Sequence, residues 1–237
     1  MLRSYLLAYP FLVLYVALVV PTFVPLARMT GRIGPLYWMA RQGCRIGLRL
    51  TGVRVRVLDG ERAYIHPCCV FVANHVGSLE APALFMVLPR IAVIMKKSLG
   101  RIPLLSSAMR MGGFICVDRK ARDSRRRALD QAVRTLQAGI SMLVFPEGTR
   151  NSGAKLLPFR PGPFQMAIDA GVPVVPVTVH GAGALMPRGA AYPRPGTFAL
   201  QFHDPVLTEG LDLGDRLELM RSVRATMQAA LDGQRPG

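Results

Sequence analysis

Acidic residues are scarce in this chain. Of 237 residues only 14 are Asp or Glu, against 30 Lys or Arg, and the formal net charge is +16 at pH 7. Such an excess attracts polyanions, and nucleic acid and anionic lipid are the two candidates. The sequence has no zinc-finger spacing and no RNP-type aromatic motif, which argues against nucleic acid. Because 51% of the residues are hydrophobic, a lipid surface fits better than DNA, whose readout requires no apolar anchor.

Cysteine pairs, repeats and low-complexity tracts are also lacking. The four cysteines include no CxxC pair, and adjacent Cys68 and Cys69 cannot form an ordinary metal site alone. With Cys44 and Cys116, they are expected to be small buried side chains in a reducing compartment. The length then predicts one sizeable core with an appendage.

A long uncharged segment lies near the start of the chain. No charged residue occurs between Tyr5 and Ala27, a span of roughly 34 Å as a helix, whereas a hydrocarbon core is about 30 Å thick. Pro10, Pro21 and Pro25 interrupt it, so a kinked or re-entrant anchor competes with a straight spanning helix. A cleaved signal peptide is disfavoured, because the run is long and has no clear A-x-A site. We predict a membrane-anchoring helix or helical hairpin.

Arginines follow this segment more often than they precede it. Arg3 stands before it, and Arg28, Arg32, Arg41, Arg45 and Arg49 stand after it. The positive-inside rule then predicts that the main body lies on the cytoplasmic face, at the inner membrane if the protein is bacterial. The last three arginines recur every four residues and predict one stripe of an interfacial amphipathic helix, with Trp38 near the headgroups. A core-packing helix with a solvated face is the alternative.

Short apolar runs alternate with helical segments beyond Gly52. Strands are expected at 53–57, 69–73, 91–95, 114–117, 141–145, 172–179 and 197–203. Helices are expected at 80–87, 104–111, 123–138, 163–170 and 213–231, and a surface loop at 182–196. This alternation predicts an α/β fold with a mostly parallel central sheet flanked by helices. Ligands of such sheets bind at the carboxyl ends of the strands.

A histidine and a carboxylate follow the strand expected at 69–73. On one helix His75 and Glu80 would point about 140° apart, so they can meet only if His75 precedes the helix and Glu80 lies in its first turns. The carboxylate would then accept the Nδ1 proton and leave Nε2 free to deprotonate a hydroxyl. We predict His75 as general base and Glu80 as its orienting acid. A capping or structural histidine is the alternative.

A second motif runs from Phe145 to Arg150. Gly148 permits close approach of a ligand to the backbone, Thr149 offers a hydroxyl, and Arg150 offers a planar fork suited to phosphate. This pattern predicts a clamp for a phosphate-bearing substrate, with an ordinary salt bridge as the alternative for the arginine. The basic run 125–127 is interpreted as a solvated or lipid-facing surface. His66, His180 and His203 are interpreted as structural.

Four ordered blocks resemble the glycerolipid acyltransferase family, whose best-known members are lysophosphatidic acid acyltransferases. The blocks are Asn74-His75 with Glu80, Gly113 with Asp118-Arg119, Phe145–Arg150, and Val172–Pro176, and the resemblance covers roughly residues 50–205. The family usually has Asp where Glu80 stands and often Ser where Gly77 stands. The resemblance implies that residues 145–150 bind the glycerol phosphate of the acceptor with help from Arg119. Glu147 would hold an arginine or a substrate hydroxyl.

The resemblance implies a membrane-bound O-acyltransferase. It would move a fatty acyl group from acyl-CoA or acyl-carrier protein to the free hydroxyl of lysophosphatidic acid, giving phosphatidic acid. We place the membrane anchor and interfacial helix in residues 1–50 and the acyltransferase domain in residues 51–237. The expected partners are a lysophospholipid acceptor, a thioester donor and anionic membrane lipid, with no metal and no resident cofactor. The alternatives are another acceptor (another lysophospholipid, glycerol-phosphate or an acylated amino-acid lipid) or a non-catalytic lipid-binding protein of the same fold.

Overall fold

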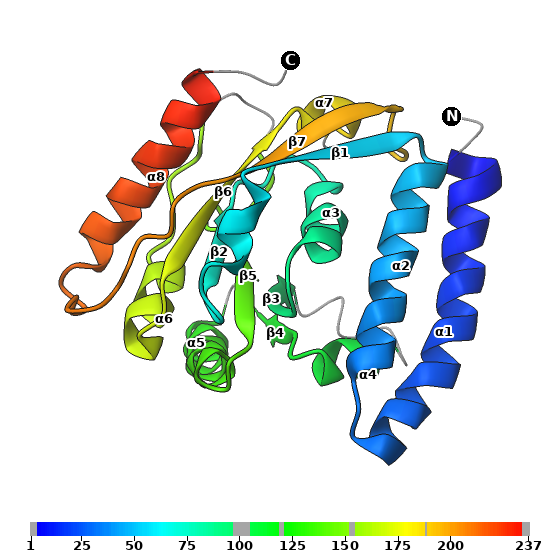
Figure 1. The fold of residues 1–237 in the computed structure, drawn as a ribbon, viewed down its shortest axis with the longest axis horizontal. Coiled ribbons are helices and arrows are strands. Elements are labelled where there is room, and N and C mark those ends of the chain that lie inside the picture. The colour runs from blue at the N-terminus through cyan, green and yellow to red at the C-terminus, as the bar shows by residue number, and fades with distance from the viewer. Residues whose placement is uncertain (1–3, 97–104, 119–120, 152–154, 188, 234–237) are drawn as a thin grey trace.

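A twisted sheet forms the centre of the protein (Figure 1). The computed structural model describes residues 4–96, 105–118, 121–151, 155–187 and 189–233. Within these residues seven strands have the order β1-β7-β6-β2-β5-β3-β4, and all neighbours pair in parallel except β6 and β7. The prediction of a mostly parallel α/β fold is confirmed. The strands are β1 (Val53–Leu58), β2 (Val70–Ala73), β3 (Ile91–Lys96), β4 (Ile115–Val117), β5 (Ser141–Val144), β6 (Val174–His180) and β7 (Gly196–Phe202).

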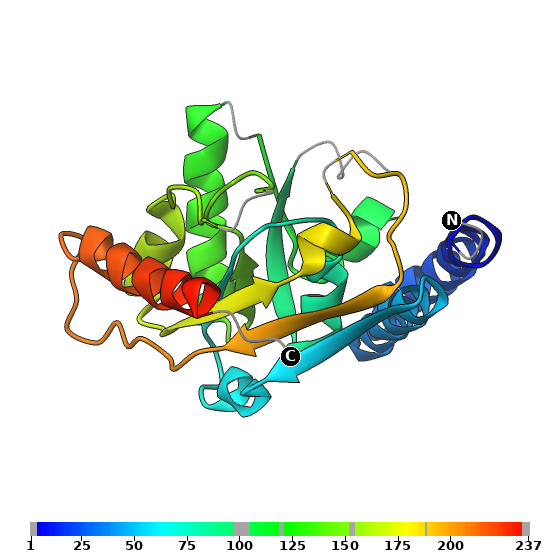
Figure 2. The same ribbon diagram turned by 90° about the horizontal axis from the view of Figure 1, so that it is seen from above.

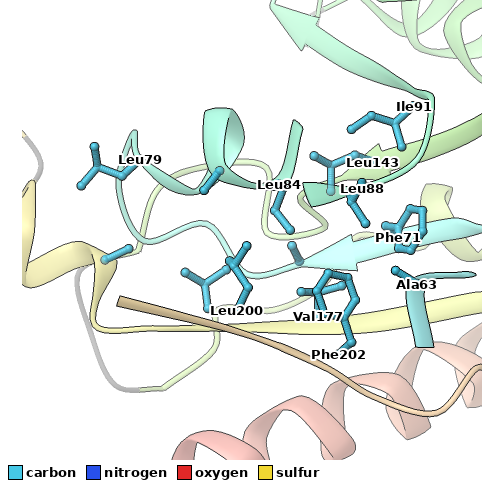
Figure 3. Packing of buried hydrophobic residues seen from close by; sticks show 14 of the residues in the cluster. Ala63, Phe71, Leu79, Leu84, Leu88, Ile91, Leu143, Val177, Leu200 and Phe202 are labelled. Atoms are coloured by element: carbon cyan, nitrogen blue, oxygen red, sulfur yellow. The ribbon is translucent and has the colours of Figure 1, made fainter. Parts of the chain in front are cut away.

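Helices cover both faces of the sheet. They are α3 (Glu80–Val87), α4 (Leu105–Met111), α5 (Arg122–Gln137), α6 (Gly162–Ala170), α7 (Ala182–Leu185) and α8 (Arg216–Asp232), with a 3-10 turn η2 (Gly60–Tyr64) after β1. In β2 the side chains alternate, so Val70 and Val72 pack with α5, α6 and α8, while Phe71 packs with α3 on the other face. Figure 3 shows the cluster around Phe71. In it the rings of Phe71 and Phe202 meet edge to face, with their centroids 6.5 Å apart.

The strand sequences follow from their places in the sheet. The central strands β2 and β6 are buried at every position, as strands covered on both faces should be. β2 is a continuous apolar run, and β6 is apolar except for Thr178 and His180. The edge strand β1 alternates valine with exposed Arg54 and Arg56. The expected loop at 182–196 differs from the structure at its start, where α7 forms because buried Ala182 packs into the core.

Two antiparallel helices stand beside the sheet. A short π-helix η1 (Ser4–Ala8) leads into α1 (Tyr9–Thr30), and α2 (Gly34–Leu50) returns alongside it (Figures 1 and 2). Gly43 lets the helices approach, because a Cβ there would lie 2.7 Å from Cε1 of Tyr15, and the Tyr15 hydroxyl donates to the Met39 carbonyl. Pro21 and Pro25 lie inside a continuous helix. By length and composition, the segment Leu6–Thr30 can cross a membrane.

The arginine stripe of α2 is divided between two roles. Arg41 donates two hydrogen bonds to the Met86 carbonyl near the end of α3, so it holds α2 against the domain instead of facing lipid. Arg45, Arg49 and Trp38 are exposed, as an interfacial face requires.

The cysteines form no disulfide. Cys69 is buried, and burial raises the pKa of its thiol to about 12, so it is unreactive near neutral pH. Cys44, Cys68 and Cys116 are half-buried, less enclosed than the sequence predicts.

Candidate active site

The histidine loop begins where β2 ends. Beyond Ala73 the side chain of Asn74 continues the sheet pairing, since its Nδ2 donates to the Val179 carbonyl (3.1 Å) and its Oδ1 accepts from the Val179 amide (2.7 Å). Asn74 is buried, so both bonds are shielded from water. The amide side chain therefore fixes the direction in which the chain leaves the sheet.

His75 and Glu80 meet as the sequence requires. His75 lies in the loop, Glu80 is the first residue of α3, and Nδ1 and Oε1 are 2.6 Å apart. The carboxylate is fully buried, and its Oε1 also accepts from the Gly77 amide at 2.9 Å. A carboxylate on Nδ1 favours the tautomer that leaves Nε2 as an acceptor. This is the geometry of a general base with an orienting acid.

Gly77 fills a narrow place beside this pair. A Cβ there would lie 3.1 Å from the Met186 carbonyl oxygen and 3.4 Å from Glu80 Oε2. A side chain at residue 77 would therefore crowd the buried carboxylate of Glu80.

Glu147 holds the histidine loop in place. Its Oε1 accepts from the His75 amide and its Oε2 accepts from the Leu157 amide, both at 3.0 Å. The Asn151 amide donates to the His75 carbonyl at 2.6 Å, and the ring of Phe145 stacks on the imidazole at 4.4 Å. The buried carboxylate thus contacts backbone rather than an arginine, and its contact with a substrate hydroxyl stays a prediction.

Gly148 accommodates a residue that the sequence analysis missed. Its φ is +69°, in the left-handed region, and a Cβ there would lie 2.6 Å from Arg160 Nε. The Arg160 guanidinium therefore lies over the turn that carries the 145–150 motif. The backbone amide of Arg160 donates to the Pro146 carbonyl. In the sequence, Arg160 lies ten residues beyond Arg150 and directly after Leu157-Pro158-Phe159. That position was the only signal for this contact.

Arg150 is brought to the histidine loop. Its Nη1 donates to Ser78 Oγ at 3.0 Å, and the exposed Thr149 precedes it. Within the described residues no carboxylate pairs with Arg150, which leaves its charge available for an anion. Arg119 lies outside the described residues, directly after β4 and Asp118.

An apolar cavity of about 460 Å³ reaches the same loop. It lies between α1, α2, α3 and α4, with Tyr15, Gly47 and Phe85 in its lining, and it extends to Ser78 and Leu79. No local sequence pattern predicts this cavity, because four separate helices supply its walls. Across the residues with assigned positions, no three His, Cys, Asp or Glu side chains gather as a metal site would require.

The chain is similar to known acyltransferases. Aligned with a 1-acyl-sn-glycerol-3-phosphate acyltransferase of Chlamydomonas reinhardtii, the chain is 38% identical over 135 residues, 56% of this chain and 41% of that protein. With the Haemophilus influenzae protein of that name it is 34% identical over 153 residues, 64% and 58% of the two chains. The chain thus spans about two fifths of the first curated relatives it matches.

The fold has a solved counterpart. The crystal structure of the 1-acyl-sn-glycerophosphate (LPA) acyltransferase PlsC from Thermotoga maritima superposes with a TM-score of 0.81 over 99% of both chains, at 24% identity. A model of the acyltransferase family matches residues 54–180, just over half of the chain, and it includes His75, Glu80 and the 145–150 motif. The chain therefore belongs to the acyltransferase family.

Proposed function

We propose that this protein is an O-acyltransferase that moves a fatty acyl group from a thioester donor to the free hydroxyl of lysophosphatidic acid, giving phosphatidic acid. The observation that carries the proposal is the 2.6 Å contact of His75 Nδ1 with buried Glu80, beside the exposed guanidinium of Arg150. The relatives' names support the choice of acceptor.

The proposed reaction transfers an acyl group from the sulfur of the thioester donor to the hydroxyl oxygen of the acceptor. His75 Nε2 removes the proton of the acceptor hydroxyl while the oxygen attacks the thioester carbonyl carbon. The C–S bond then breaks, and the thiolate takes the proton from the imidazolium. Glu80 stabilises the imidazolium and holds the ring in one orientation. Because no electron leaves the reactants, the proposed reaction needs no redox cofactor.

Two features would position the acceptor and the acyl chain. Arg150, with Arg119 as a second predicted contact, would bind the phosphate bidentately, and Thr149 would add a hydroxyl. The apolar cavity that ends at Ser78 and Leu79 would hold an acyl chain, since its lining offers almost no polar partner. The two features meet at the His75 loop, where the ester bond would form.

The proposed site works at a bilayer surface. Leu14 and Leu18 on α1 are 69% and 70% exposed, which suits contact with lipid tails. The arginines after the segment would place the catalytic domain on the cytoplasmic face, at the inner membrane if the protein is bacterial, and would attract anionic lipid. The donor would be acyl-CoA or acyl-carrier protein.

A thioester-consumption assay on purified protein tests the proposal. With lysophosphatidic acid as acceptor, His75→Ala should lower kcat by about 100-fold or more, because a general base contributes about that much. Arg150→Gln should raise the KM for lysophosphatidic acid and leave the rate with monoacylglycerol unchanged. An unaltered rate in His75→Ala would exclude the proposed acyl transfer. Equal use of monoacylglycerol by the unmodified protein would show that the clamp is misassigned.

A further inference from the structure

A groove lies on the sheet face that α5 and α6 cover. Its volume is about 890 Å³, and it runs along the carboxyl ends of β3, β4 and β5. Apolar side chains form its floor, among them Ile94, Val117 and Val144. Four arginines line it: Arg122, Arg125, Arg126 and Arg160. It is therefore a basic groove with an apolar floor, distinct from the apolar cavity between α1, α2, α3 and α4.

This basic groove ends at Phe145, the ring next to the proposed base. Phe145 lines it, and the same ring stacks on His75 with centroids 4.4 Å apart. Gly148 also lines it, whereas Arg150 does not. Phe145 therefore separates the groove from the proposed base, and the groove lies apart from the Arg150 clamp.

Three of the four arginines around the groove have charges that are available for a ligand. Arg122, Arg126 and Arg160 are exposed, and none has an ion-pair partner among the described residues. The groove is also lined by the first residues of α5 and α6, Arg122 and Gly162. At the start of α5, unpaired amide groups and the positive end of the helix dipole face such a space, whereas Pro161 and Pro163 leave few amide donors at the start of α6. The start of α5 and the exposed arginines thus both favour an anion in this groove.

The shape and charge of the groove favour a polyphosphate with an apolar part. A lysophospholipid headgroup has a single phosphate, and Arg150 already serves it in the proposed function. An acyl-CoA donor has three phosphates and an adenine ring, on which an arginine plane can stack. Its thiol end extends from the phosphates on a long arm that can pass Phe145 toward His75.

We propose that this groove binds the 3′-phosphorylated ADP end of an acyl-CoA donor. The inference rests on the proposed acyl-transfer function and assigns its donor to coenzyme A. It also changes the interpretation of the basic run 125–127, since Arg125 and Arg126 line the groove and Arg127 does not. The exposed guanidiniums would bind phosphate, and the apolar floor would contact the adenine or the pantetheine arm.

The test compares two sets of arginine variants on one helix. The double variant Arg122→Gln with Arg126→Gln should raise the KM for acyl-CoA by about tenfold or more, since removing one charge-assisted hydrogen bond to phosphate weakens binding by roughly that factor. The KM for lysophosphatidic acid should not change. The matched control is Arg127→Gln, an exposed neighbour outside the groove, which should behave like the unmodified protein. Both sets replace exposed side chains, so folding is retained.

A binding measurement separates this inference from the proposed reaction. Calorimetry with coenzyme A and no acceptor, on His75→Ala protein, should show binding that the double variant loses and that dephospho-coenzyme A shows more weakly. That measurement needs no acyl transfer, so it stands even if lysophosphatidic acid is the wrong acceptor. The inference is overturned if the double variant binds coenzyme A normally, or if only the KM for lysophosphatidic acid rises. It is also overturned if only an acyl-carrier protein donor is affected, or if Arg127→Gln has the same effect.

Discussion

Neutralising Glu80 tests the proposed catalytic pair most directly. Two unit charges 2.6 Å apart, as Nδ1 and Oε1 are here, attract by about 6 kcal/mol at an effective dielectric constant of about 20. This is an upper limit for what the carboxylate gives the imidazolium, because glutamine keeps one acceptor oxygen. We expect Glu80→Gln to raise the barrier by about 2–4 kcal/mol and to lower kcat by about 30-fold to about 1000-fold.

The same substitution should have a smaller effect on folding. Among the described residues no donor reaches the buried Oε2 of Glu80, and the new amide group would take its place without a partner. An unsatisfied buried polar group costs about 1–3 kcal/mol, so the melting temperature should fall while the protein stays folded. Circular dichroism before each assay keeps this effect apart from catalysis.

The assay is steady-state thiol release with the acceptor varied. The KM for lysophosphatidic acid should stay within about twofold, because Glu80 acts on the base and not on the phosphate. Glu80→Asp retains the charge and should lose less kcat than Glu80→Gln, and Glu218→Gln on the exposed face of α8 is the control. An unchanged kcat in Glu80→Gln, or a change confined to KM, would refute the reasoning.

Three further predictions concern the turn, the apolar cavity and a buried histidine. Gly148→Ala should lower the unfolding free energy by about 1–3 kcal/mol in urea, because its φ is +69° and its Cβ would meet Arg160; full stability would contradict the turn geometry. Gly47→Met should shift kcat/KM toward shorter acyl donors, because a side chain there points into open space in the cavity; an unchanged chain-length profile would show that the cavity holds no acyl chain. Burial, and then the charges of Arg62 and His180, lower the pKa of His203 below its usual 6.5. The unfolded chain therefore binds this proton more readily, so stability should fall as pH drops below about 6.5, and His203→Gln should flatten that part of the profile measured by urea unfolding.

The histidine site shows how far the sequence could lead. The spacing of His75 and Glu80 allows a contact only across a helix start, and the structure has that arrangement. For Glu147 the sequence predicted a carboxylate but not the groups that it contacts. A carboxylate in a glycine turn can face an arginine, a substrate or backbone amides, and only the fold brings the amides of His75 and Leu157 to its two oxygens.

Sequence by itself determined the order of strands and helices along the chain, the contact of His75 with Glu80 and the apolar segment at the start. Each rests on neighbours along the chain, through side-chain alternation, helix periodicity and residues placed at strand ends. The tertiary structure decided which groups meet across long separations. It brought Asn74 into contact with Val179, Arg41 with Met86 and Arg160 with Gly148. It also formed the apolar cavity and the basic groove between elements that are distant in the chain. Such contacts depend on how whole layers pack, which no local pattern contains.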